Sequence, residues 1–202
     1  MQKVNYGLEM EREIALICGR APRLLLQSCC APCSSSVLEK LAEHFRVTVY
    51  YYNPNISPEG EFRRRAEEQR RLIGEMALGG VVDIITEKYD ENEFLNAVRG
   101  LENEPEGGKR CSACFHLRLE KTAQKARELG FEYFTTTLTV SPLKDAQRLN
   151  SIGLALGEKY GVKFLPSDFK KRDGYKRSIE LSEQYGLYRQ DYCGCRFSVR
   201  EK

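Results

Sequence analysis

The sequence lacks long hydrophobic segments. Its longest apolar runs have about half a dozen residues, whereas a helix that spans a bilayer needs roughly 20. The first few residues also lack the apolar stretch of a secretory signal peptide. Internal repeats and low-complexity tracts are missing as well. These absences predict a cytoplasmic protein that does not associate with a membrane.

The chain also lacks a large excess of charge. Its 202 residues carry a net charge of +3, with 30% charged and 41% hydrophobic residues, which is ordinary for a globular protein. This length suits one α/β domain over residues 1–202, with a helical extension at 1–22. The charge excess lies in a C-terminal segment, residues 168–202, which holds 9 basic and 6 acidic side chains. That placement is compatible with a phosphate-rich partner.

Apolar, β-branched segments alternate with amphipathic ones along the chain. Three consecutive leucines predict a buried strand at 23–27. Further strands are expected at 47–52, 81–86, 131–137 and 162–165. Helices are expected at 5–20, 34–45, 58–78, 92–98, 111–129, 144–160 and 175–185. The alternation predicts a three-layer fold, a parallel sheet with helices on both faces, followed by a C-terminal helical and cysteine-rich tail.

Ligands bind a parallel sheet of this kind at the carboxyl ends of its strands. The loops at 28–33, 53–59 and 138–142 are therefore expected to form the site. Ser34, Ser35 and Ser36 are N-cap candidates for the helix after the first strand. A helix N-terminus favours negative charge, so thiolates in the first loop would be stabilised there.

Eight cysteines are many for a cytoplasmic protein, where structural disulfides are rare. Clustered cysteines in such a protein indicate metal or redox chemistry. Seven of the eight form three groups: Cys29, Cys30 and Cys33; Cys111 and Cys114; and Cys193 and Cys195. The eighth, Cys18, is expected to be a buried thiol on the N-terminal helix.

Cys111 and Cys114 open a predicted helix, and their spacing places both sulfurs on one face of it. The helix start is expected to lower their pKa values. Together with Cys29 and Cys30 they offer four thiolates, a set that suits Zn²⁺ or an iron–sulfur cluster. The spacing does not decide between these metals, and reduced thiols that merely pack close together are the alternative.

Cys193-Gly194-Cys195 has a different spacing from the other cysteine groups and suggests a different role. A disulfide between cysteines one residue apart would be strained and easily reduced. A redox-active pair is the favoured interpretation, with a second metal site or a structural role as alternatives. Asp191, two residues earlier, is a candidate proton donor or an oxygen ligand to iron, and otherwise a solvated acid.

Basic residues cluster near the C-terminus, interleaved with Tyr175, Tyr185, Tyr188 and Tyr192. Charge combined with stackable rings suits an unpaired nucleotide in RNA. The candidate RNA-binding residues are Lys170, Lys171, Arg172, Lys176 and Arg177. A second basic run, 63–65 with 70–71, is interpreted as a solvated helix face paired with acidic neighbours.

Four further residues receive structural roles. Lys144 and Asp145 are expected to cap and charge a helix start. His116 is expected to form hydrogen bonds rather than to bind a metal, and His44 to lie on the surface.

Several motifs occur together in a fixed order. They are Cys-Cys-Ala-Pro-Cys at 29–33, Arg-Cys-Ser-Ala-Cys-Phe at 110–115, Thr-Thr-Thr-Leu-Thr-Val-Ser-Pro-Leu-Lys at 135–144, Asp-Phe-Lys-Lys at 168–171, Arg-Ser-Ile-Glu-Leu-Ser at 177–182 and Leu-Tyr-Arg-Gln-Asp-Tyr-Cys-Gly-Cys at 187–195. From about residue 23 to residue 198 the chain resembles the QueH family of epoxyqueuosine reductases. Any one motif is a weak signal, whereas the ordered set is specific.

The resemblance implies the last step of queuosine biosynthesis, in which an epoxide on a modified wobble nucleoside of tRNA becomes an alkene. It implies an iron–sulfur enzyme that needs no cobalamin, with a fold like the adenine-nucleotide α-hydrolases (HUP or PP-loop type). By motif, the ligands of a [4Fe-4S] cluster are Cys29, Cys30, Cys111 and Cys114, and the redox-active pair is Cys193 and Cys195. Cys33 receives no role. The first loop lacks the glycines of a phosphate-binding loop, so ATP use is not expected.

Two other function classes stay open. The same cysteines suit zinc in a non-catalytic tRNA-binding module, or a tRNA sulfur-transfer enzyme. Within the reductase interpretation, a second, mononuclear iron is an alternative to the dithiol of the tail. The electron donor is not identified by the sequence.

Overall fold

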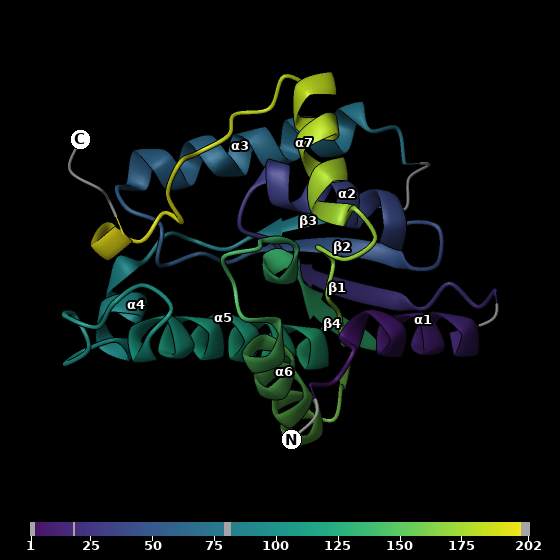
Figure 1. Ribbon diagram of the computed structural model, residues 1–202, viewed down its shortest axis with the longest axis horizontal. Helices are drawn as coiled ribbons and strands as arrows, with labels where there is room; N and C mark the ends of the chain where they lie inside the picture. The colour runs from purple at the N-terminus through teal and green to yellow at the C-terminus, as the bar shows by residue number, and fades with distance from the viewer. Residues whose placement is uncertain (1–2, 18, 79–81, 199–202) are drawn as a thin grey trace.

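The core of the protein is a sheet of five parallel strands in the order β3-β2-β1-β4-β5 (Figure 1). The computed structural model describes residues 3–17, 19–78 and 82–198, so Cys18 lies outside the described residues. The strands are β1 (Arg23–Gln27), β2 (Arg46–Tyr51), β3 (Val82–Thr86), β4 (Tyr133–Thr136) and β5 (Lys163–Phe164). This topology confirms the predicted parallel α/β fold.

Helices cover both faces of the sheet, as the alternating pattern predicts. Figure 1 shows α2, α3 and α7 on one face and α5 and α6 on the other. The helices are α1 (Tyr6–Ile17), α2 (Ala31–Leu41), α3 (Glu59–Glu75), α4 (Glu91–Ala97), α5 (Lys109–Glu128), α6 (Ala146–Tyr160) and α7 (Gly174–Gln184), with two short 3-10 helices, η1 (Thr137–Val140) and η2 (Arg196–Ser198). None of the helices in the described part of the chain has the length and hydrophobicity that a bilayer span requires.

The central strand β1 is buried on both of its faces. Leu24 and Leu26 pack with α2 and α3, whereas Leu25 packs with α5 and α6. Successive side chains of a strand point to opposite faces, so a strand with a helical layer on each side needs apolar residues throughout. This explains the three consecutive leucines. Replacing one of them with alanine should cost about 2–5 kcal/mol of folding stability.

The predicted start of α2 was wrong by three residues. The helix begins at Ala31 with Cys30 in the N-cap position, and Pro32 lies in the first turn, where its missing N–H costs nothing. Ser34 and Ser35 lie inside the helix, and their hydroxyls donate to backbone carbonyls three residues earlier. Cys33 is therefore on the first helical turn and not in the loop.

The two flanking segments pack onto the sheet layers. Met10 and Ile17 of α1 are buried in the same core as Leu24 and Leu26. Helix α7 packs on α2, and the segment that follows it runs along α3 (Figure 1). We call that segment, residues 186–198, the tail. That residues 1–202 form one domain stays a prediction.

Candidate functional site

Six of the seven cysteines in the described chain line one cavity of about 350 Å³. It lies at the carboxyl ends of β1 and β4, between the N-terminal turns of α2 and α5 and the tail. The lining cysteines are Cys29, Cys33, Cys111, Cys114, Cys193 and Cys195. Three segments far apart in sequence thus deliver their thiols to one space.

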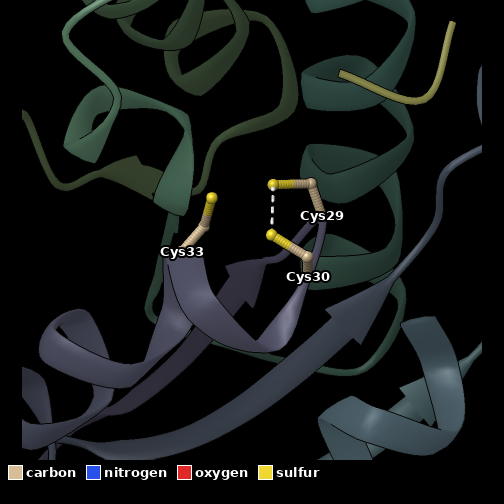
Figure 2. Close-up of side chains that lie close together, drawn as sticks. All are labelled: Cys29, Cys30 and Cys33. Atoms are coloured by element: carbon tan, nitrogen blue, oxygen red, sulfur yellow. Dashed lines mark hydrogen bonds between the residues drawn. The ribbon is translucent and has the colours of Figure 1, made fainter. Parts of the chain in front are cut away.

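Cys29, Cys30 and Cys33 form a compact triad. Their sulfur atoms all lie within 4.8 Å of one another, and the Cys29 and Cys30 sulfurs are 3.7 Å apart (Figure 2). Cys30 is buried, whereas the other two are partly buried. Cys33, which has no role by resemblance, belongs to the triad because α2 begins early enough to turn its side chain toward the other two (Figure 2).

A buried polar network fixes the strand ends beneath the triad. The Gln27 amide donates to Asn53 Oδ1 at 3.2 Å and accepts from Thr136 Oγ1 at 2.9 Å. Arg118 of α5 donates to the same Asn53 oxygen at 2.7 Å. These bonds join the ends of β1, β2 and β4 to α5. Because all four side chains are buried, losing one partner would leave an unpaired polar group.

Gln69 of α3 performs a similar task for the first cysteine loop. Its Oε1 accepts from the hydroxyls of Ser28 and Ser34, at 2.8 and 2.9 Å. The two serines flank the triad in sequence. The loop is therefore fixed at both of its ends.

Charge is unevenly shared among the three thiols. Hydrogen bonds from Cys30 and Cys33 hold the pKa of Cys29 well below its usual range, and the charges of Arg118 and Arg65 act in the same direction. Donating to the Cys29 sulfur raises the pKa of Cys30 to about 12, and that of Cys33 is raised for the same reason. The triad thus favours one thiolate held by two thiols.

Cys111 and Cys114 lie on the first turns of α5, as predicted, and line the same cavity outside the 4.8 Å triad. The Gly107 N–H donates to Cys111 Sγ at 3.2 Å. Burial raises the pKa of Cys114 to about 11, although Arg118 opposes the shift. The expectation of a lowered pKa is therefore wrong for Cys114, because loss of solvent outweighs the helix start.

Cys193 and Cys195 are free thiols in the tail. Cys193 Sγ lies 3.0 Å from Ser198 Oγ. A hydrogen bond from Cys195 and the charge of Lys144 lower the pKa of Cys193 to about 5, whereas that of Cys195 is raised. The pair is arranged as a thiolate with a neighbouring thiol. Asp191 is exposed and lines the same cavity.

Comparison with known proteins identifies the family. A family model described as epoxyqueuosine reductase QueH matches residues 24–201. The chain is 46% identical to the epoxyqueuosine reductase QueH of Streptococcus pyogenes serotype M1, over 98% of this chain and 80% of that protein. The chain belongs to the QueH family of epoxyqueuosine reductases.

Other QueH proteins agree with this assignment. The Staphylococcus epidermidis protein is 42% identical over 100% of this chain and 87% of its own length. The Thermotoga maritima protein is 37% identical over 89% of this chain and 91% of its own length. The family resemblance inferred from the ordered motifs is confirmed, and with it an oxidoreductase activity.

Two residues of the QueH site were not predicted to act in it: Gln190 was not singled out, and Lys144 was given only a role at a helix start. Gln190 donates to Cys30 Sγ at 3.0 Å, and its only sequence signal is its place in the tail motif. Lys144 lines the cavity and pairs with Glu106 at 3.2 Å. Burial lowers the pKa of Lys144, but the Cys193 thiolate and the Glu106 carboxylate raise it above its usual value. It is a fixed cation beside the tail thiols.

Asp145, in contrast, does cap α6 as predicted, and it accepts from the Gln147 N–H at 2.9 Å. His116 is half exposed with its Nδ1 3.6 Å from a Glu120 carboxylate oxygen, and its assignment as a hydrogen-bonding residue rather than a metal ligand stays a prediction. His44 is partly exposed.

The basic residues near the C-terminus lie on α7 and the turn before it. Lys170 and Lys171 both contact Asp168, Arg172 pairs with Glu11, and Arg177 forms a bidentate pair with Glu39. Lys176 is exposed. Tyr175, between them, lines the cavity. The segment therefore reaches from the outer surface to the mouth of the site.

The other basic run is not a uniform solvated face. Arg63 is exposed and pairs with Glu59, as expected. Arg65 contradicts the expectation, because its side chain is only 1% exposed and pairs with Glu61 inside the protein. Its side chain points into the protein, where it contacts the Cys193 carbonyl of the tail.

Proposed function

We propose that the protein removes the epoxide oxygen of epoxyqueuosine at the wobble position of tRNA and leaves queuosine. The reaction converts an epoxide into an alkene, takes up two electrons and two protons, and releases water. The single observation that carries the proposal is the cavity that brings six cysteines, Asp191 and Lys144 together in a QueH-family chain. It offers redox-active sulfur, an acid and a fixed cation beside one binding space.

Cys29, Cys30, Cys111 and Cys114 are the residues that would hold a [4Fe-4S] cluster. Thiolates are the ligands of such clusters, and these four come from two segments of the chain. Four buried polar atoms with no hydrogen-bond partner belong to cavity-lining residues, which fits a further group in this space: Asn55 Oδ1, Arg110 Nε, Arg118 Nε and Gln190 Oε1. When bound, the cluster supplies electrons one at a time, with no need for cobalamin.

Cys193 and Cys195 would act as the two-electron partner of the substrate. Oxidation of the Cys193 thiolate and the Cys195 thiol to a disulfide releases two electrons and one proton, and epoxide opening consumes two of each, so an acid must supply the second proton. The low pKa of Cys193 keeps one sulfur in the reactive thiolate form. An external electron donor, still unidentified, must then reduce the disulfide. The alternative is a second, mononuclear iron on the same two sulfurs with Asp191 as an oxygen ligand.

Asp191 would protonate the oxygen as the ring opens. It is exposed on the cavity wall two residues before Cys193, so a proton from solvent can recharge it. Lys144 would stabilise negative charge on the same oxygen.

Lys170, Lys171, Arg172, Lys176 and Arg177 would bind the phosphates of the tRNA anticodon arm. Support comes from Tyr175, which lies in the same segment, lines the cavity and has a ring available for stacking. Four of these residues contact acidic side chains in the free protein, so RNA would have to replace those contacts.

Zinc is the competing occupant, in a tRNA-binding module or a sulfur-transfer enzyme. Its specific support is the 3.7 Å distance between the Cys29 and Cys30 sulfurs. A tetrahedral zinc site with Zn–S bonds of about 2.3 Å has sulfurs about 3.8 Å apart.

The decisive experiment is anaerobic purification followed by iron, sulfide and zinc analysis and an assay with tRNA that carries epoxyqueuosine. The reductase proposal expects brown protein with iron and sulfide, and alkene product when dithionite is added without cobalamin. Stoichiometric zinc in colourless protein that binds this tRNA without converting it would overturn the proposal in favour of the module.

A further inference from the structure

Arg65 is a buried guanidinium that the proposed chemistry does not use. It lies on α3 with a side chain that is 1% exposed, and its Nε donates to Glu61 Oε1 at 2.6 Å. Its Nη2 is buried without a hydrogen-bond partner. A helix that otherwise turns its arginines outward has no local reason to bury one. The reason must lie in what packs against it.

The tail packs against it. Arg65 Nη1 donates to the Cys193 carbonyl at 3.4 Å, and the guanidinium lies 5.2 Å from the centre of the Tyr192 ring. Both contacts fall on the residues that lead into Cys193-Gly194-Cys195. Arg65 therefore meets the tail at the point where the redox pair begins.

Gly194 shows how closely the backbone follows this guanidinium. Its φ is +95°, and a Cβ built there would lie 3.0 Å from Arg65 Nη1 and 2.8 Å from Ile56 Cγ1. The Ser57 N–H donates to the Gly194 carbonyl at 2.9 Å and so fixes the peptide that follows Gly194. A glycine is needed here both for its backbone conformation and for the close approach.

We propose that Arg65 is a positioning residue for Cys193 and Cys195. The backbone from Tyr192 to Gly194 packs against its guanidinium, and this contact keeps both thiols facing the cavity. The catalytic consequence rests on the proposed function, since it assumes that the pair takes part in turnover. The structural claim does not. Besides the positive charge that it places near Cys29, Arg65 acts through the tail, and it touches no reacting atom.

The test uses the rate at which a thiol reagent labels Cys195 in the reduced, folded protein. Cys195 is 8% exposed, so labelling requires the tail to open. Trypsin releases Cys193 and Cys195 in the peptide 190–196, and Cys111 and Cys114 in the peptide 111–118. Cys114 packs in the same apolar cluster as Cys195 and would be uncovered with it, so the control for unfolding of the whole chain is hydrogen exchange of the Leu24–Leu26 amides in the buried strand β1.

Arg65→Met should speed the labelling of Cys195 about tenfold and leave the hydrogen exchange of the β1 amides unchanged. Gly194→Ala, which disturbs the same contact from the tail side without removing a charge, should do the same. Arg63→Met removes an arginine with the same i,i+4 pairing on the same helix, but one that is 70% exposed, and should change nothing. Arg65→Lys should fail to restore protection, because an ammonium cannot reproduce the planar fork.

Three results would overturn the proposal. Labelling of Cys195 at the wild-type rate in Arg65→Met would show that the tail keeps its conformation without Arg65. Equal acceleration of Cys195 labelling and of β1 amide exchange would reveal a general structural role. Full protection in Arg65→Lys would show that charge alone is enough. Labelling is measured without turnover, so these outcomes test the positioning role even if the reductase assay fails. A loss of kcat confined to Arg65→Met and Gly194→Ala would support both the positioning role and the proposed reductase function.

Discussion

Cys29, Cys30 and Cys33 belong to the framework of the sheet, whereas Cys193 and Cys195 lie on a segment laid over it. The first group occupies the end of β1 and the first turn of α2, above buried hydrogen bonds that join three strand ends. The tail is attached by contacts with side chains of α3 and with Ser57 in the loop before α3. An exposed ion pair from Arg196 to Glu91, at 2.7 Å, adds a third contact.

The difference in support suggests a difference in task. A metal site needs ligands whose positions do not change, and a strand end in a buried network provides them. A dithiol that cycles to a disulfide needs its two sulfurs to approach and separate, which suits a segment that packs on the domain without being part of its hydrogen-bonded sheet. Substitutions in the two groups should therefore have separable effects, and four predictions test that separation.

The largest effect is expected from Cys29→Ser or Cys111→Ser. Each should abolish both iron binding and turnover, because a serine hydroxyl does not replace a thiolate toward iron. Iron content and visible absorption of anaerobic protein measure this. Cys33→Ser is the matched control, and we expect it to keep its iron. If Cys33→Ser lost its iron and Cys30→Ser kept it, Cys33 would be the ligand in place of Cys30.

The next effect should remove turnover alone. Cys193→Ser with Cys195→Ser is expected to keep the absorption spectrum and the tRNA affinity but to form no alkene. If the tail binds a second iron instead, iron should fall by about one atom per chain while the cluster absorption persists. Wild-type turnover in this double variant would show that Cys193 and Cys195 have no part in the reaction.

A smaller effect is expected in the pH dependence of Cys193 reactivity. Because its pKa is lowered to about 5, its alkylation rate should stay level from about pH 8 to pH 6 and fall to half near pH 5. An ordinary cysteine loses about tenfold per pH unit below about 8.5. Lys144→Met removes a charge that favours the thiolate, so its profile should move to higher pH. A profile with its midpoint above pH 8 in the wild type would contradict the thiolate assignment.

The smallest effect concerns tRNA affinity. A triple variant with alanine at Lys170, Lys171 and Arg172 should flatten the log–log salt dependence of tRNA binding by about 2, or roughly 0.7–0.9 per phosphate contact. The spectrum and the cysteine reactivities should not change. Lys159→Ala, at the far end of α6, is the control and should leave the slope as it is. An unchanged slope in the triple variant would mean that tRNA binds elsewhere.

Local sequence was sufficient for the elements of the fold. Three leucines identified β1 with its observed bounds, because a strand buried on both faces must be apolar at every position. The start of α2 was missed because proline favours the first turn, and Cys30 takes the N-cap position without any side-chain hydrogen bond. Nothing in the serine pattern reveals that choice.

Local sequence was less sufficient for the site. The cysteines are recognisable from their spacing and their rarity, so the candidate ligands were found. Arg65 was misassigned because its run of three arginines is indistinguishable from a solvated helix face. Gln69 and Gln190 were missed, since each acts across more than thirty residues of sequence through a single amide.

What the sequence determined by itself is which chemistry is available: thiols in three groups, a strand–helix alternation that exposes loops at one edge, and an ordered set of motifs that identifies the QueH family. Tertiary structure alone decided which of these groups meet. It placed Cys33 with Cys29 and Cys30, brought Lys144 beside the tail, and buried Arg65 beneath Gly194. The reason is physical, because periodicity reports the solvent exposure of single elements, whereas a shared cavity depends on how several elements pack at once.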